Sequence, residues 1–325
     1  MAELTMVQAI QQALKTEMQR DPNVILLGED IGRNGGVFRV TDGLMEEFGK
    51  ERVIDTPLAE SAIIGTAVGM GVNGLRPVAE IQFLGFIYEA MDQMASQAAR
   101  MRFKSAGRFT VPMVIRSPYG GGVRTPELHS DSLEALFSHT PGLKIVMPSN
   151  PYDAKGLLIS AIRDSDPVVF LEPMKLYRSF KQEVPEDDYA IPIGKAQVVK
   201  EGYHATIVSW GPPVLLLKKI VDEYEKEDIH LELIDLRTVA PIDIDTILKS
   251  VEKTERLLIV HEAVKTNGVG AEIAALVSER GLFSLAAPIL RVTGYDTPYP
   301  VGSVEDDWLP NHHRIKASLE KLLSY

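Results

Sequence analysis

The chain turns at Asp55-Thr56-Pro57-Leu58-Ala59-Glu60-Ser61, between a short apolar run and a segment rich in small residues. Pro57 fixes its own φ, lacks an amide proton and favours an extended backbone at Thr56. The turn therefore brings the carboxylate of Glu60 to the point where a strand ends and a helix begins, and ligands of open α/β sheets bind at that rim. The helix dipole alone also favours an acidic residue in the first turn of a helix, so a ligand-binding role needs support from the rest of the chain.

Strand and helix patterns alternate on both sides of this turn. Apolar runs such as residues 24–27 and 168–171 are typical of buried parallel strands, and segments with helical spacing separate them. Thr5-Met6-Val7-Gln8 reads as a capping box, and Asn150-Pro151 reads as a helix start. The pattern predicts an α/β fold with two doubly wound domains.

The domain boundaries follow from a change in composition. Residues 180–202 are polar and marked by prolines, which is typical of a connector between compact units. We expect an N-terminal domain at residues 1–185, a linker at 186–202 and a C-terminal domain at 203–325.

Composition excludes several classes of function. Of the 325 residues, 45% are hydrophobic and 24% are charged, as in globular proteins. The net charge of −11 argues against nucleic acid or an anionic membrane as a partner. The absence of cysteine excludes thiolate catalysis and cysteine-ligated metals, and no apolar run approaches the roughly 20 residues of a membrane span. We expect a soluble, cytoplasmic protein.

Two further segments carry candidate functional residues. Phe86 follows an expected strand at residues 77–83 and so lies at a second strand-to-helix rim, although a core aromatic fits this position equally well. From Ile87 onward the apolar residues recur at helical spacing. The glycine-rich loop at residues 117–132 follows an expected strand at 111–116, and long loops of this kind are typically functional. Its His129 is a candidate acid/base or donor group, because imidazole titrates near neutrality.

Two stretches match known sequence motifs but do not lie in the structural context that these motifs require. Gly69-Met70-Gly71-Val72-Asn73-Gly74 matches a dinucleotide-binding loop, but it ends a helix instead of following a strand. His129-Ser130-Asp131 has the letters of a hydrolase triad, but consecutive residues cannot adopt the geometry of the triad. A lone nucleotide-binding protein and a serine hydrolase are therefore not favoured.

Five motifs in order carry a resemblance to a known family. They are Asp55-Thr56-Pro57-Leu58-Ala59-Glu60-Ser61, Glu80-Ile81-Gln82-Phe83-Leu84-Gly85-Phe86, Ser117-Pro118-Tyr119-Gly120-Gly121-Gly122 with Leu128-His129-Ser130, the strand with Val168, Phe170, Leu171 and Glu172, and Asp235-Leu236-Arg237-Thr238. As a set they resemble the beta subunits of pyruvate dehydrogenase, the decarboxylating component of the thiamine diphosphate-dependent 2-oxo acid dehydrogenases. The resemblance extends from Thr5 to the C-terminus. It implies a pyrimidine-binding transketolase-like domain followed by a transketolase C-terminal-like domain.

The resemblance also implies a site for thiamine diphosphate. Glu60 would hydrogen-bond N1′ of the pyrimidine, which promotes removal of the weakly acidic proton of the thiazolium ring. Phe86 would carry the ring on its face, and Leu58 and Gln82 would line the same site. His129 would donate a proton or a hydrogen bond while the acyl fragment passes to a lipoyl group.

Family members also hold a monovalent cation, usually potassium, mainly through backbone carbonyl oxygens. The matching positions in this chain are Met113, Ala161, Ile162, Asp164 and Asp166. Asp166 departs from the Asn that is common in relatives.

The partners follow from two motifs that the sequence lacks. The family binds the diphosphate through Mg²⁺ with Gly-Asp-Gly and Asn-Asn strings, and neither occurs here. The resemblance therefore implies that an alpha subunit supplies this half of the site, in an α₂β₂ heterotetramer with active sites at the α–β contacts. The beta chains would pair through helices near residues 61–73 and 87–101, with Glu89 and Asp92 in an acidic internal passage. The C-terminal domain would dock the subunit-binding domain of the dihydrolipoyl acetyltransferase core, whose lipoyl domain takes the acetyl group.

Other readings remain open at this point. Beta subunits for branched-chain 2-oxo acids or acetoin share the same motifs, although the Gly120-Gly121-Gly122 loop and the approach to His129 look more like those for pyruvate. A non-catalytic scaffold chain, which stabilises the alpha subunit and docks the core, is the alternative of a different class.

Overall fold

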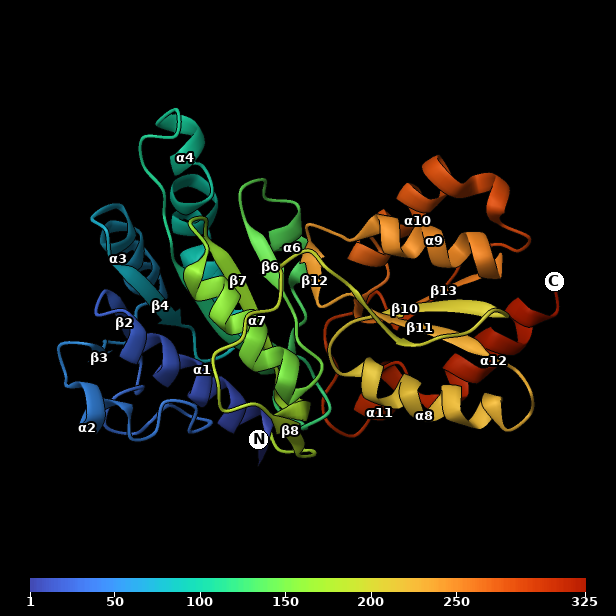
Figure 1. Ribbon diagram of the computed structural model, residues 1–325, viewed down its shortest axis with the longest axis horizontal. Helices are drawn as coiled ribbons and strands as arrows, with labels where there is room; N and C mark the ends of the chain where they lie inside the picture. Colours follow the sequence, from blue (N-terminus) through green and yellow to red (C-terminus); the bar gives the residue numbers. More distant parts are fainter.

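The computed structural model describes residues 1–325 and forms two α/β lobes that lie next to each other along the long axis (Figure 1). The N-terminal lobe is built on a seven-stranded sheet and the C-terminal lobe on a five-stranded sheet. A two-stranded ribbon pairs β1 (Ala2–Leu4) with β8 (Gln182–Val184). None of the helices combines the length and the apolar character that a membrane span requires. The expected α/β architecture is confirmed.

The N-terminal sheet has six parallel strands and one antiparallel edge strand. In spatial order they are β12 (Thr238–Ala240), β6 (Lys144–Val146), β7 (Val168–Pro173), β5 (Val114–Tyr119), β4 (Arg76–Glu80), β2 (Val24–Gly28) and β3 (Val53–Asp55). The antiparallel strand is β12, which pairs with β6 although its residues come long after the polar connector. This strand therefore ties the second half of the chain to the first sheet.

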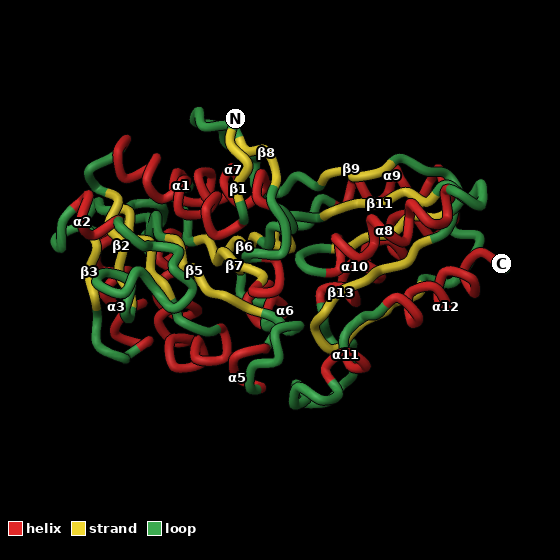
Figure 2. Tube along the Cα trace, turned by 90° about the horizontal axis from the view of Figure 1, so that it is seen from below, coloured by secondary structure: helices red, strands yellow, loops and turns green.

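Helices cover both faces of the N-terminal sheet. On one face lie α1 (Met6–Arg20) and α7 (Pro151–Arg163), and on the other lie α3 (Glu60–Val72), η1 (Leu84–Ala90) and η2 (Asp92–Ala98), as Figure 2 shows for the longer helices. Successive residues of a strand point to opposite faces, so Leu26 belongs to the core with α1 and Leu27 belongs to the core with α3. Burial on both faces explains the continuous apolar runs in the sequence.

The C-terminal sheet repeats this arrangement on a smaller scale. In spatial order its strands are β14 (Leu290–Gly294), β13 (Leu257–Val264), β10 (Ala205–Ser209), β11 (Leu231–Asp235) and β9 (Gln197–Lys200), of which only β9 is antiparallel. One face is covered by α8 (Pro213–Glu225) and α12 (His312–Leu323), and the other by α9 (Ile244–Thr254) and α10 (Val269–Gly281). The core beneath α9 and α10 is continuous with the core beneath α3, so one hydrophobic cluster runs through both lobes.

Short elements complete the chain. They are α2 (Leu44–Phe48), α4 (Met101–Lys104), α5 (Glu127–Ser130), α6 (Glu134–Ser138), η3 (Met174–Leu176), η4 (Leu282–Ser284) and α11 (Glu305–Trp308).

The predicted helix starts are confirmed. Thr5 accepts a hydrogen bond from the amide of Gln8, whose side chain accepts one from the amide of Thr5 at 2.9 Å. Asn150 caps α7 by accepting from the amide of Asp153 at 2.9 Å, with Pro151 in the first turn.

Two elements differ from the prediction in detail. The helical segment begins at Leu84, before Phe86, and is wound first as a 3₁₀ helix and then as a π-helix. Of the four apolar positions predicted for its inner face, Ile87, Met94 and Ala98 are buried and Met91 is half-buried. The strand expected at residues 111–116 instead forms β5 and ends at Tyr119, because Pro118 and Tyr119 still pair with β7. The backbone of the glycine-rich loop therefore leaves the sheet later than expected.

Candidate active site

Several candidate residues share one edge of the N-terminal sheet. In the sheet register, Gly28 at the end of β2 lies opposite both Asp55 at the end of β3 and Glu80 at the end of β4. Because these strands are parallel, the segments that follow them leave the sheet on the same side. Glu60 follows β3, and Phe86 follows β4, so the structure places both at this carboxyl edge.

The turn before Glu60 is fixed by backbone contacts. The amide of Thr56 donates to the carbonyl of Gly28 at 3.0 Å, and the carboxylate of Asp55 accepts from the amides of Gly32 at 2.5 Å and Arg33 at 3.2 Å. These bonds attach the loop after β2 to the turn after β3. Glu60 is the first residue of α3, half-buried, at the positive end of the helix dipole.

A second carboxyl group, Glu29, lies near Glu60 and was not predicted as a site residue. Burial raises the pKa of Glu29, and the negative charges of Asp30 and Glu60 raise it further. The sequence signal was its position directly after β2, the strand between those that lead to Glu60 and Phe86. An acidic residue in a strand-to-loop turn is so common that this signal alone does not separate a site from a surface turn.

The structure brings His129 together with Phe86. The ring of His129 lies 5.2 Å from the ring of Phe86 and 4.2 Å from the ring of Phe83, measured between centroids. The two phenyl rings lie 6.1 Å apart, edge to face. Nδ1 of His129 is buried and has no hydrogen-bond partner in the chain, so this nitrogen is available to a group that the chain does not supply.

Gly85 allows this close approach. A Cβ atom on Gly85 would overlap the carbonyl group of Leu128, the residue before His129. Only glycine fits at this position between η1 and α5. The close approach of Gly85 to Leu128 lets His129 pack against Phe83 and Phe86.

The remaining predicted cofactor contacts lie on the same two turns. Leu58 is 68% exposed on the turn before Glu60, an unusual exposure for a large apolar side chain. Gln82 is half-buried between β4 and Phe83. Both residues belong to the segments that carry Glu60 and Phe86.

A buried ionic network supports the sheet below this edge. Arg116 on β5 donates to Glu80 on β4 at 2.7 Å and to both carboxylate oxygens of Glu172 on β7 at 2.6 and 2.9 Å. Tyr177 donates to Glu172 at 2.6 Å. Burial raises the pKa of Glu80, and the charge of Arg116 opposes that rise. The network joins three neighbouring strands, and the sequence did not indicate it because its members are far apart along the chain.

The predicted potassium ligands surround the end of α7. Nη1 of Arg76 donates to the carbonyl oxygens of Ile162 at 2.9 Å and Asp164 at 3.1 Å, so these two carbonyls converge. The carbonyl of Met113 accepts from the amide of Val168 at 3.0 Å. Each carbonyl oxygen keeps a second lone pair, although a guanidinium already stands beside two of them.

The last two predicted ligands have other contacts as well. The amide of Asp164 donates to the carbonyl of Ala161 at 3.3 Å. The carboxylate of Asp166 binds Arg102 at 2.6 Å, so a cation here would draw on backbone oxygens more than on this side chain.

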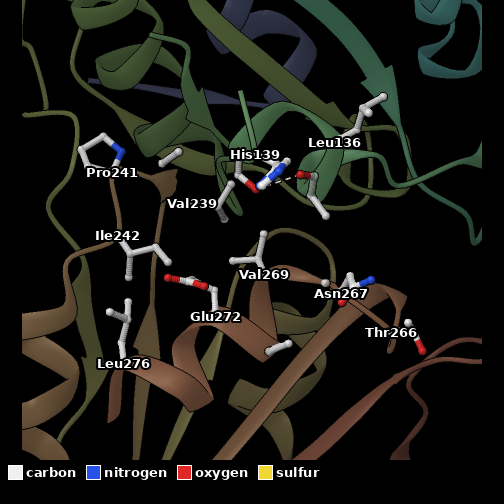
Figure 3. Close-up of a pocket in the computed structure, with 15 residues that line it drawn as sticks. Leu136, His139, Val239, Pro241, Ile242, Thr266, Asn267, Val269, Glu272 and Leu276 are labelled. Carbon is white, nitrogen blue, oxygen red and sulfur yellow. Dashed lines mark hydrogen bonds between the residues drawn. The ribbon is translucent and has the colours of Figure 1, made fainter. Parts of the chain in front are cut away.

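A separate cavity lies between the lobes. It has a volume of about 1060 Å³. Its lining includes Leu136 of α6, Val239 of β12 and Glu272 of α10, and also His139 and Asn267, which lie just outside α6 and α10. Figure 3 shows Glu272 extending into this cavity from α10. None of the predicted site residues lines it, so it is distinct from the edge of β2, β3 and β4.

Comparisons with known proteins agree on both lobes. Residues 2–179 match the model of the transketolase pyrimidine-binding domain, and residues 194–315 match that of the transketolase C-terminal domain. A solved structure described as a split-gene transketolase, an inactive β₄ tetramer, superposes with a TM-score of 0.81 at 21% identity, covering 99% of both chains. At that identity the likeness concerns the fold.

Sequence relatives are much closer. The pyruvate dehydrogenase E1 component subunit beta of Bacillus subtilis is 58% identical over 325 residues, covering 100% of both chains. The subunits of the same name from Staphylococcus epidermidis and Staphylococcus aureus are 58% and 57% identical, covering 98% and 100% of this chain and 100% of each relative.

Proposed function

The chain belongs to the family of pyruvate dehydrogenase E1 beta subunits, and on that basis we propose that the edge of its N-terminal sheet holds the pyrimidine end of thiamine diphosphate. With an alpha subunit, the chain decarboxylates pyruvate and passes the acetyl group to the lipoyl domain of dihydrolipoyl acetyltransferase. One observation supports the proposal above all. Glu60 and Phe86 lie at the same edge of the sheet, and His129 packs against Phe86, although the three residues are far apart in sequence.

The residues at this edge fit such a ligand. The site has an apolar and aromatic surface, a carboxylate at a helix start, and a buried nitrogen of His129 without a partner. A flat heteroaromatic ring needs this combination, because its faces are apolar and its edge nitrogens form hydrogen bonds. When bound, thiamine diphosphate supplies an electron sink for the electrons that remain when carbon dioxide leaves.

The chain's own residues have distinct tasks in this proposal. Glu60 would hydrogen-bond N1′ of the pyrimidine, and this bond would favour the protonation of the ring that its chemistry requires. Phe86 orients the ring, and Leu58 and Gln82 exclude water beside it. His129 would donate a proton or a hydrogen bond while the two-carbon fragment passes to the disulfide of the lipoyl group; the S–S bond breaks, one sulfur takes the acetyl group and the other becomes a thiol, so that the disulfide is the oxidant.

The partners belong to the same proposal. The relatives' names describe one subunit of a larger component, and we propose an α₂β₂ assembly in which the alpha subunit binds Mg²⁺ and the diphosphate. The C-terminal lobe would dock the acetyltransferase core, and the cell compartment would be the cytoplasm. Glu89 and Asp92 are exposed on the single chain, so an acidic passage involving them would have to form between chains.

The potassium site is part of the proposal as well. It is supported by the convergence of the Ile162 and Asp164 carbonyl oxygens near the end of α7. Bound there, potassium would join the end of α7 to the strands that follow it.

The central experiment replaces Glu60 in the co-expressed heterotetramer. We expect Glu60→Gln to assemble normally, to lower pyruvate decarboxylation by on the order of a hundredfold and to weaken thiamine diphosphate binding measured by calorimetry. Glu51→Gln, at an exposed position of the same lobe, is the control and should behave as the wild type. Unchanged turnover of the assembled Glu60→Gln enzyme would instead favour the scaffold role.

Substrate choice needs its own measurement. Profiling the heterotetramer with pyruvate, branched-chain 2-oxo acids and acetoin distinguishes the related activities. We expect the highest kcat/KM for pyruvate, and a preference for a branched-chain acid or acetoin would contradict this assignment.

A further inference from the structure

We propose that Glu262 and Glu305 of the C-terminal lobe are positioning residues, which hold the Gly120–Gly122 loop and thereby place His129 for acetyl transfer. The inference rests on the proposed function of His129. It adds residues from the other lobe that act on the reaction through His129 and touch neither substrate nor cofactor.

The two carboxylates bind successive amides of the loop. Oε1 of Glu262, on β13, accepts from the amide of Gly121. Oε1 of Glu305, on α11, accepts from the amide of Gly122 at 2.8 Å and from the amide of Arg124 at 3.2 Å. These three hydrogen bonds attach the loop to the C-terminal lobe. Hydrogen bonds from amides to a carboxylate are among the stronger ones in proteins.

Glu262 contacts the chain on both sides of His129. Upstream it binds the amide of Gly121, and downstream it accepts from the hydroxyl of Ser132 at 3.3 Å. Gly120 also donates to the carbonyl of Asp131 at 3.2 Å, which closes the loop at its base. The segment that carries His129 is therefore a closed loop with one buried carboxylate at its two ends.

Two of the three glycines are required by the approach of the C-terminal lobe. A Cβ on Gly121 would overlap the hydroxyl of Tyr299, which itself donates to Glu305 at 2.6 Å. Gly120 has a φ of +83°, and a Cβ there would lie 2.9 Å from Oε1 of Glu262. Gly122 has a φ of +85°, and a Cβ there would lie 2.5 Å from the side chain of Lys175 in the N-terminal lobe. Contact with Glu262 and Tyr299 thus explains Gly120 and Gly121, and the sequence alone did not indicate these contacts.

The surroundings of Glu262 show that its carboxylate is held at a cost. Burial raises the pKa of Glu262 to about 7; the amide of Gly121 opposes the rise, the charge of Glu134 adds to it, and Lys175 and Ser132 also oppose it. A buried carboxyl group without hydrogen bonds would be unfavourable. The hydrogen bonds that Glu262 accepts from Gly121 and Ser132 offset the unfavourable burial of its carboxyl group.

The experiment uses the assembled α₂β₂ enzyme with Glu262→Ala, Glu305→Ala and the milder Tyr299→Phe, which removes only the hydroxyl that donates to Glu305. Hydrogen exchange of the peptide covering residues 117–132 reports on the loop directly. Acetylation of a free lipoyl domain and dye-coupled pyruvate decarboxylation separate acetyl transfer from the earlier step.

Glu232→Ala is the matched control. Glu232 is also a buried carboxylate of the C-terminal lobe, and it accepts from a glycine amide, that of Gly202, at 3.2 Å. Any general effect of removing a buried carboxylate should therefore also appear in Glu232→Ala, whereas hydrogen exchange of the loop should not change in this variant. Glu262→Gln keeps an oxygen acceptor for Gly121 and should restore most of the wild-type behaviour.

The expected result is exchange in the loop that is faster by about tenfold in the two alanine variants, since each loses a hydrogen bond to a charged group. Acetyl transfer should fall by about tenfold or more, with decarboxylation changed by less than about threefold, as for loss of positioning at one step. Loop exchange at the wild-type rate in both alanine variants, or acetyl transfer no lower than in the Glu232→Ala control, overturns the proposal. His129→Ala is measured in parallel: normal acetyl transfer in this variant would show that the role proposed for His129 is wrong, while loop exchange still decides whether the carboxylates hold the loop.

Discussion

Arg237 and Asp153 form a bidentate ion pair across the junction of the two lobes. Nε and Nη2 of Arg237 donate to the two carboxylate oxygens of Asp153, at 2.8 and 2.6 Å. Asp153 lies in the first turn of α7, its side chain is 1% exposed, and that of Arg237 is 13% exposed. Because the pair is bidentate and buried, removing one partner would leave the other charged and buried, and this would lower the stability of the folded state.

The first prediction concerns this pair. Arg237→Ala should lower the free energy of unfolding by about 3–5 kcal/mol, the usual cost of an uncompensated buried charge. Arg280→Ala, which breaks an exposed pair with Asp245, is the control and should cost less than about 1 kcal/mol. Urea unfolding followed by circular dichroism measures both, and equal losses would contradict the role of Arg237.

The second prediction concerns pH. Burial, together with the nearby charge of Asp153 and against the hydrogen bond from Ser149, raises the pKa of Asp235 from 3.8 to about 7. The folded state therefore holds this proton more tightly than the unfolded chain does. The stability that the proton contributes is fully present below pH 3.8 and is lost as the pH rises toward 7.

Asp235→Asn removes this titration. The free energy of unfolding should then fall less steeply between about pH 4 and 7, by up to roughly 1.4 kcal/mol per pH unit, the limit for one proton. Unfolding curves at a series of pH values check this, with the exposed Asp245→Asn as the control. A slope identical to that of the wild type would show that Asp235 does not hold the proton.

The third prediction tests the contact between η1 and α5. Gly85→Ala places a Cβ against the carbonyl of Leu128 and should displace His129. We expect acetyl transfer to fall by on the order of tenfold to a hundredfold, as for misplacement of a reacting group by about an ångström. Gly281→Ala, where the added Cβ meets only the end of the Leu248 side chain, should retain activity. If Gly85→Ala keeps full acetyl transfer, His129 does not depend on this contact.

The fourth prediction concerns pairing between beta chains. Gly69 lies on the exposed face of α3, and a Cβ there would meet nothing within 4 Å. Gly69→Ala should therefore stabilise the isolated chain by about 0.5–1 kcal/mol. If α3 packs closely against a second chain, as the sequence predicts, the same change should weaken assembly in sedimentation velocity. Unaltered assembly would place the pairing surface elsewhere.

The fifth prediction concerns potassium. Ions bound only by the folded state stabilise it, by about 2.7 kcal/mol at a hundredfold excess over Kd. Thermal unfolding should therefore shift to a higher Tm in potassium chloride than in choline chloride of equal ionic strength. An identical Tm in both salts would argue that the guanidinium of Arg76 already fills the role of the cation.

Local features of the fold were predictable from the sequence because they depend on neighbouring residues. The cap at Thr5 and the cap at Asn150 each involve residues three positions apart, and buried parallel strands show as continuous apolar runs. The three-residue strand β12 has no such pattern, since its pairing with β6 is set by contacts between the lobes. The close approach of Gly85 to Leu128 has no signal in the sequence either, because the two residues are far apart along the chain.

The candidate site was predictable only in part for a similar reason. Motifs in the sequence indicated Glu60, Phe86 and His129, each in or directly after a short recognisable stretch. The attachment of the loop to Glu262 spans 141 positions, and no spacing rule connects two such residues. Glu29 was overlooked because only the fold shows that the strand before it lies between those leading to Glu60 and Phe86.

The shared hydrophobic cluster has a consequence for how the chain can be divided. A break in the expected linker at residues 186–202 would not yield two independent fragments, although its composition is that of a connector between domains. The first fragment would lose β12 and leave β6 as a bare edge open to aggregation. Residues of α10 belong to the hydrophobic cluster that runs through both lobes. During synthesis, this cluster therefore stays partly exposed until α10 has left the ribosome.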